Sequence, residues 1–130
     1  MVTAVVAAVM IAAFASFAGA FTMSEKVVVA NELIAIARVP AGGFTPQERI
    51  DRVNERLAYI LGFEPLNPGS IYAVRDGGSR IIMVGDTQLI TVTPADARAN
   101  GTTVSQLTSA WLQNAREALP QARPTPSVPG

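Results

Sequence analysis

The first 23 residues, Met1 to Met23, carry no charged side chain, although the whole chain has ten acidic and ten basic residues. Ala, Val, Ile, Met and Phe make up most of this segment. Such a run is typical of an export signal or a membrane helix, and not of the amphipathic elements that build a small domain. The folded domain must therefore come from the rest of the chain, and we expect it to span residues 24–120.

Two interpretations of residues 1–23 stay open. As a cleaved signal peptide, the segment has an apolar stretch from Val5 to Phe17, and Ala18-Gly19-Ala20 matches the A-x-A cleavage pattern. As a retained anchor, it is long enough to span a bilayer, which takes about 20 apolar residues. Either interpretation predicts an exported protein that is periplasmic or extracellular, with membrane contact only through residues 1–23 if they are not cleaved.

Composition narrows the chemistry of the expected domain. The chain contains neither Cys nor His, so thiolate nucleophiles, the usual zinc ligands and the commonest general base are all missing. The balanced charge does not favour a nucleic-acid partner, which would need a basic surface. We therefore expect no catalytic residue, no metal site and no cofactor, and a partner among envelope or membrane proteins.

The clearest helix signal begins at Thr45. Thr45 and Glu48 form the S/T-x-x-E capping box, and Pro46 suits the first helical position. Apolar residues then recur at helical spacing, and Gly62 is a natural stop. The apolar stripe consists of Ile50, Val53, Leu57, Ile60 and Leu61.

Alternation and turn residues predict the strands. Lys26 to Val39 reads as two short strands around a turn at Ala30-Asn31-Glu32, or as one longer strand. Three further strands are expected at 71–75, 80–84 and 87–93, with a tight Gly-X turn at Gly85-Asp86. Together, these three strands predict an antiparallel meander.

Two more helices are predicted near the end of the chain. Thr93-Pro94-Ala95-Asp96 repeats the capping signature and predicts a short helix before Asn100-Gly101. Thr103 caps a longer helix whose apolar face includes Trp111, expected in the core, and which Pro120 should end. Residues 121–130 are rich in proline and are expected to be a disordered tail.

These elements predict the α+β class. Two amphipathic helices must bury their stripes, and an antiparallel sheet offers one face for this purpose. We therefore expect a small two-layer sandwich in which the antiparallel meander carries both helices on one face, preceded by the apolar leader.

The segments ERIDRVNERL and RIIMVGDTQLITVTPADARANGTTVSQLTSAWLQNAREAL carry a resemblance. They resemble the N-terminal extracytoplasmic domain that precedes the membrane helices of some bacterial small-conductance-type mechanosensitive ion channels. The resemblance covers most of the range from Val27 to Pro120. It implies an extracytoplasmic accessory domain, and it does not extend to channel activity.

Three arginines on the first helix are the candidate site. Arg49, Arg52 and Arg56 lie on one stripe between the apolar stripe and the acidic stripe. They are candidates for contact with an anion or with a partner's carboxylates. The preferred interpretation is structural: their stems cover the edge of the core while their charges pair with neighbouring acids, as Glu48 and Arg52 would at i,i+4.

Asp76, Asp86 and Asp96 lie near predicted turns. They are candidates for an acid pair, which requires that two of them meet in one cleft. Aspartate is also favoured in turns and caps for its own sake, and that is the preferred interpretation.

The sequence therefore favours a non-catalytic exported accessory or binding module at the bacterial cell envelope. One alternative is a membrane-anchored interaction or regulatory domain associated with a channel or transporter. A second alternative, from a different class, is a small carboxylate-dependent hydrolase.

Overall fold

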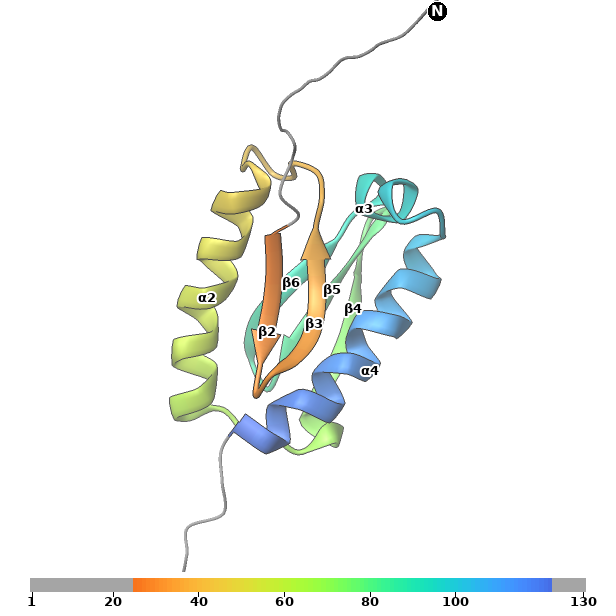
Figure 1. Cartoon of the computed structure of the whole chain (residues 1–130). Helices are drawn as coiled ribbons and strands as arrows, with labels where there is room; N and C mark the ends of the chain where they lie inside the picture. Colours follow the sequence, from red (N-terminus) through yellow and green to blue (C-terminus); the bar gives the residue numbers. More distant parts are fainter. Residues whose placement is uncertain (1–24, 123–130) are drawn as a thin grey trace, which may run out of the picture.

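The computed structural model describes residues 25–122. The predicted leader and most of the predicted proline-rich tail lie outside the described residues. The described chain has the α+β composition expected from the sequence, with five strands, two long helices, one short helix and a 3₁₀ turn at Pro68–Ser70 (Figure 1). No helix within residues 25–122 is both long enough and apolar enough to cross a membrane.

The first two strands form a hairpin of their own. β2 (Glu25–Val29) pairs antiparallel with β3 (Glu32–Ala37), and within residues 25–122 it pairs with no other strand. Ala30 and Asn31 link them with φ values of 52° and 65°, which is the left-handed backbone of a type I′ turn. Of the two interpretations of this region, the structure has the hairpin.

The predicted meander is present as a second sheet. β4 (Ile71–Asp76), β5 (Ser79–Val84) and β6 (Thr87–Val92) pair antiparallel in the order β4-β5-β6. Gly85 has a φ of 58° and opens the turn between β5 and β6, as its Gly-X sequence predicts. Strand alternation directs one set of side chains to the core, and the fully buried members include Ile71, Ile82 and Val92.

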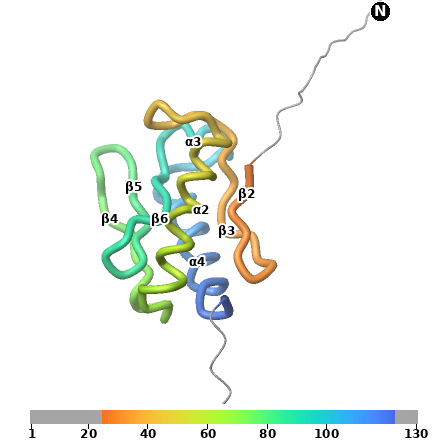
Figure 2. Tube along the Cα trace, turned by 90° about the vertical axis from the view of Figure 1, so that its left-hand side faces the viewer, coloured from red at the N-terminus to blue at the C-terminus, as the bar shows by residue number. Residues whose placement is uncertain are grey.

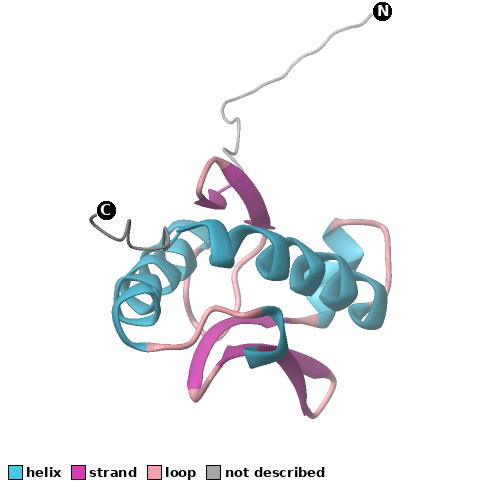
Figure 3. Ribbon diagram, turned by 90° about the horizontal axis from the view of Figure 1, so that it is seen from below, coloured by secondary structure: helices cyan, strands magenta, loops and turns pink. Residues whose placement is uncertain are grey.

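Both long helices cover the same face of this three-stranded sheet. α2 (Pro46–Phe63) packs along β6, and α4 (Val104–Ala122) packs across β4 and β5. The hairpin lies on the other side of the helices and contacts both of them, so that the helices stand between two sheets (Figures 2 and 3). The hairpin thus adds a layer to the predicted two-layer sandwich.

The core fills the space enclosed by the two sheets and the two helices. Leu57 of α2 and Trp111 of α4 are 6% and 5% exposed, so both predicted stripe residues are core residues. α3 (Pro94–Ala99) follows β6 directly and is the short helix expected from the second capping signature.

Two predicted helix ends differ from the structure. α2 continues one residue past Gly62, and α4 continues past Pro120 to Ala122. Pro120 removes one i→i−4 hydrogen bond, but only two helical residues follow it, so the loss is confined to the end of α4. The Gln121 side chain donates to the Glu117 carbonyl there, at 2.8 Å. Residues 121 and 122 therefore belong to the helix and not to the tail.

Candidate functional site: a groove beside the arginine stripe

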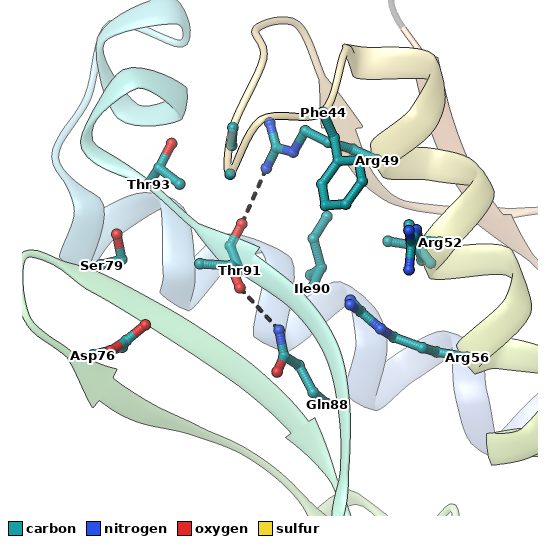
Figure 4. A pocket seen from close by; sticks show the side chains of 13 residues that line it. Phe44, Arg49, Arg52, Arg56, Asp76, Ser79, Gln88, Ile90, Thr91 and Thr93 are labelled. Atoms are coloured by element: carbon teal, nitrogen blue, oxygen red, sulfur yellow. Dashed lines mark hydrogen bonds between the residues drawn. The ribbon is translucent and has the colours of Figure 1, made fainter.

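A groove of about 370 Å³ lies between the first half of α2 and the free edge of β6 (Figure 4). Its volume is in the range of small-molecule sites, which begins at roughly 300 Å³. The stripe of α2 arginines forms one wall, and polar side chains from the sheet form the opposite wall. The lining residues are Ala41, Gly42, Phe44, Arg49, Arg52, Val53, Arg56, Asp76, Ser79, Gln88, Ile90, Thr91 and Thr93.

A tight turn positions the aromatic residue of the groove. Ala41 and Phe44 exchange two backbone hydrogen bonds, of 3.0 and 2.9 Å, around Gly42 and Gly43. Both glycines have positive φ, at 59° and 81°. The turn ends immediately before the Thr45 cap of α2, so Phe44 is held at the start of the helix whose arginines line the groove.

Arg49 is buried, and its charge is neutralised inside the protein. Its guanidinium contacts the Asp96 carboxylate twice: Nη1 donates to Oδ1 at 2.8 Å and Nη2 donates to Oδ2 at 2.9 Å. It also donates to the Val39 carbonyl at 2.8 Å and to the Thr91 carbonyl at 3.1 Å. Arg49 is 7% exposed and Asp96 is fully buried, so this ion pair belongs to the core.

Asp96 accepts further hydrogen bonds through Oδ2. Asp96 is the third residue of α3, and its Oδ2 accepts from the backbone N–H of Thr93 at 3.0 Å and from the Thr93 hydroxyl at 2.9 Å. The same carboxylate thus completes the capping box of α3 and neutralises Arg49. A buried ion pair needs such complete hydrogen bonding, because desolvation of two charges costs several kcal/mol per ion, to order of magnitude.

Arg49 therefore has the structural role of the two that the sequence left open, with a distant carboxylate as its partner in place of a neighbouring acid. The sequence placed it with Arg52 and Arg56 as a contact for an external anion, but its donors face Asp96 and two backbone carbonyls. The physical reason is that α3 brings a carboxylate to the start of α2, over a separation of 47 residues. Arg49 is a structural residue at the rim of the groove.

Arg52 is exposed and carries an unneutralised charge in the groove. Its guanidinium carbon lies 4.6 Å from the centre of the Phe44 ring. An aromatic ring stabilises a cation through its negative face but offers no acceptor atom for the N–H groups. Phe44 therefore orients Arg52 and leaves its hydrogen-bond donors available.

Arg56 lies one helical turn further along and is half-buried. Its side chain extends from α2 toward β6, where Nη1 donates to the Leu89 carbonyl over a long 3.4 Å. Arg49 donates to the Thr91 carbonyl on the same edge of β6, so the two arginines together cover the edge that pairs with no described strand. One long bond uses little of the donor capacity of a guanidinium, which has five N–H groups.

The acids on α2 do not neutralise these two arginines. The Glu48 carboxylate accepts from the Thr45 backbone N–H at 2.9 Å in the capping box, and Asp51 accepts from Gln47 at 2.8 Å. Arg49–Asp96 is the ion pair found within residues 25–122. The expected Glu48–Arg52 pair is therefore absent, because the cap holds Glu48 at the helix start.

The three aspartates considered as an acid pair do not meet. Asp96 is buried against Arg49, and Asp76 lines the groove where β4 ends. Asp86 lies in the turn between β5 and β6, at the opposite end of the sheet. Among the described residues, no group of three or more Asp or Glu side chains is arranged to hold a metal ion.

The sequence analysis did not identify the aromatic residue of the groove, the partner of Asp96 or the neutral polar wall. For Phe44 a signal does exist, because a Gly-Gly turn directly before a capping box indicates that the intervening side chain has a fixed position. Asp96 was interpreted as a cap, which is correct, but its partner on α2 has no local signature. Four neutral polar residues of the sheet wall, Ser79, Gln88, Thr91 and Thr93, likewise become neighbours only through strand pairing.

Residues 26–122 match the family described as Domain of unknown function (DUF8459), and the chain belongs to that family. A search of curated proteins and a search of solved structures found no match to the chain.

Proposed function

We propose that this domain is a non-catalytic binding module of the cell envelope, and that the groove beside α2 binds an anionic group of its ligand. The observation that carries the proposal is the pair of arginines, Arg52 and Arg56, one turn apart in a groove and without an acidic partner among the described residues. Two guanidinium groups at this spacing suit a carboxylate or a phosphate, which can accept from both.

The rest of the groove supports binding. Neutral hydroxyl and amide side chains on the sheet wall can donate to or accept from a ligand without changing protonation state. Gln88 already donates to the Thr91 hydroxyl at 3.1 Å, which orients both side chains along the groove (Figure 4). Phe44 adds an apolar surface next to the cations.

The envelope location rests on the apolar segment of residues 1–23, which lies outside the described residues. In that compartment, a domain without disulfides depends on its core and its caps for stability. The channel or transporter association implied by the resemblance is compatible with this proposal, since an accessory domain needs a recognition surface.

The test is calorimetric titration of the full chain with two probes, glutarate and inorganic phosphate, at low ionic strength. We expect at least one probe to bind and the R52Q/R56Q double variant to lose at least tenfold in affinity. Substituting Gln keeps a polar side chain with N–H donors, although a shorter one, and removes its charge.

R98Q is the matched control, because Arg98 is an exposed arginine on α3 that does not line the groove. It removes one positive charge and should leave the affinity within about twofold, since a distant exposed charge is screened by solvent and salt. Equal losses in R98Q and R52Q/R56Q would indicate a general charge effect and would contradict the proposal. Failure of both probes to bind would contradict it as well.

A further inference from the structure

The outer face of the three-stranded sheet has an apolar area on β4 and β5 that is not covered by any described element. Side chains of a strand alternate between faces, so the residues between the buried ones point away from the helices. Tyr72 and Val74 of β4 are 37% and 38% exposed, and Ile81 and Met83 of β5 are half-buried. These four residues are called the outer apolar face below.

The strand register joins this face to the groove. Tyr72 pairs with Met83, and Met83 pairs with Gln88. Val74 pairs with Ile81, and Ile81 pairs with Thr91. Each row thus begins with apolar residues on β4 and β5 and ends on β6 at a residue that lines the groove. The outer apolar face and the groove with Arg52 and Arg56 are one continuous surface.

We infer that this surface binds an amphipathic α-helix of a partner protein, with the apolar side of the helix on the outer apolar face and its acidic residues at Arg52 and Arg56. The inference rests on the proposed function, because it names the carrier of the anionic group. Charge complementarity selects the acidic flank: the two arginines without an acidic partner border the face on the β6 side.

The dimensions of the sheet suit one helix. Three strands spaced about 4.8 Å apart cover a width of about 10 Å, which is close to the diameter of a helix with its side chains. Strands of six residues are roughly 20 Å long, and a helix of about 13 residues covers that length. The inner face of the same sheet already carries α2 and α4. A partner helix on the outer face would therefore give a sheet with helices on both faces, which is a common layered arrangement.

The test is selection from a displayed library of 14-residue peptides, with Leu, Ala, Gln, Glu and Lys varied at every position, against the full chain. We expect enriched peptides to repeat Leu at i, i+3, i+4 and i+7 and to carry Glu beside that stripe. V74E should lower the affinity of an enriched peptide by at least tenfold, and R52Q/R56Q by a similar factor. V74T, which keeps the shape of the side chain, should lower it about threefold and serves if V74E does not fold.

V28E is the matched control, because Val28 is an exposed apolar strand residue on the hairpin. It should leave peptide affinity unchanged. The inference is overturned if no peptide is enriched, if Lys replaces Glu in the enriched set, or if V28E is the damaging variant. A V74E-sensitive dimer in sedimentation, or V74E-sensitive binding to vesicles of phosphatidylcholine and phosphatidylglycerol, would overturn it in favour of a second copy or a membrane.

The two proposals can fail separately. If glutarate or phosphate binds and depends on Arg52 and Arg56 while no peptide is enriched, the groove stands and the helix inference fails. If neither probe binds and R52Q/R56Q does not change the affinity of the enriched peptides, the anion site is wrong. The inference of an acidic helix is then wrong as well.

Discussion

Arg49, Arg52 and Arg56 lie on one stripe of α2, but they differ in burial and in hydrogen-bond partners. Arg49 makes four hydrogen bonds, to Asp96 and two carbonyls, whereas Arg56 makes one long bond and Arg52 lies against the Phe44 ring. The distinction has an energetic consequence, because truncating one member of a buried ion pair leaves an uncompensated charge.

Asp96→Ala should therefore lower the free energy of unfolding by about 3–5 kcal/mol. The variant leaves the Arg49 guanidinium unpaired in the core, and it also removes the carboxylate that accepts from the Thr93 backbone N–H in the capping box of α3. Asp86→Ala, on an exposed turn, should cost less than about 1 kcal/mol. Urea midpoints of the two variants decide the matter. Equal midpoints would mean that the Arg49–Asp96 pair does not exist in solution.

Gly85 and Gly77 provide a second comparison between single residues. Each has a positive φ, of 58° and 59°, and each opens a two-residue hairpin turn. A Cβ on Gly85 would overlap the Glu64 carboxylate, while a Cβ on Gly77 would meet no atom within 4 Å. Gly77→Ala should cost about 1–2 kcal/mol from backbone conformation alone.

Gly85→Ala should cost more than Gly77→Ala by on the order of 1 kcal/mol, because Glu64 must move and give up its hydrogen bond from Thr87. Thermal unfolding of both variants, with and without Glu64→Ala, measures this coupling. In the Glu64→Ala background the two glycine substitutions should cost the same. A difference that persists there would exclude Glu64 as its source.

At the scale of elements, the β2–β3 hairpin carries a local conflict. Its type I′ turn requires positive φ at two positions, and alanine occupies the first of them. An L-residue other than Gly or Asn is strained in this conformation by about 1–2 kcal/mol. The hairpin therefore forms because its buried face packs on both helices and not because its turn favours it.

Ala30→Gly should consequently stabilise the protein, by about 0.5–1 kcal/mol after the entropy that glycine adds to the unfolded chain. Ala58→Gly, at an exposed position within α2, should destabilise it by about 1 kcal/mol. The change from Ala to Gly should thus raise the free energy of unfolding at one site and lower it at the other. The shift of the urea midpoint measures both effects. A loss of stability in Ala30→Gly would show that the turn is not of type I′ in solution.

At the scale of the whole molecule, the elements were predictable and their assembly was only partly so. A capping box spans four consecutive residues and a Gly-X turn spans two. Both signals at Thr45–Glu48 and Gly85-Asp86 could therefore be predicted from the sequence alone. The burial of Arg49 depends on where α3 meets α2, which no local pattern encodes.

The position of the hairpin was likewise beyond local patterns. The alternation of its residues indicated strands but not the layer to which these strands belong. In the structure, the helices lie between the hairpin and the three-stranded sheet. The same reason explains the candidate site. Its arginines were visible as a stripe, but Phe44 and the polar wall of β6 join them only after the sheet and α2 have packed together.

Arg52 and Arg56 are proposed as the ligand-binding cations of the groove, while Arg49 stabilises the core. The most direct measurement is NMR of the arginine guanidinium groups in the full chain during titration with glutarate and then with inorganic phosphate. The account predicts that the Arg52 and Arg56 signals shift in a saturable way with at least one of the two probes, whereas the Arg49 signals, restricted by Asp96, stay in place. Shifts centred on Arg49, or no shift at any of the three arginines, would contradict it.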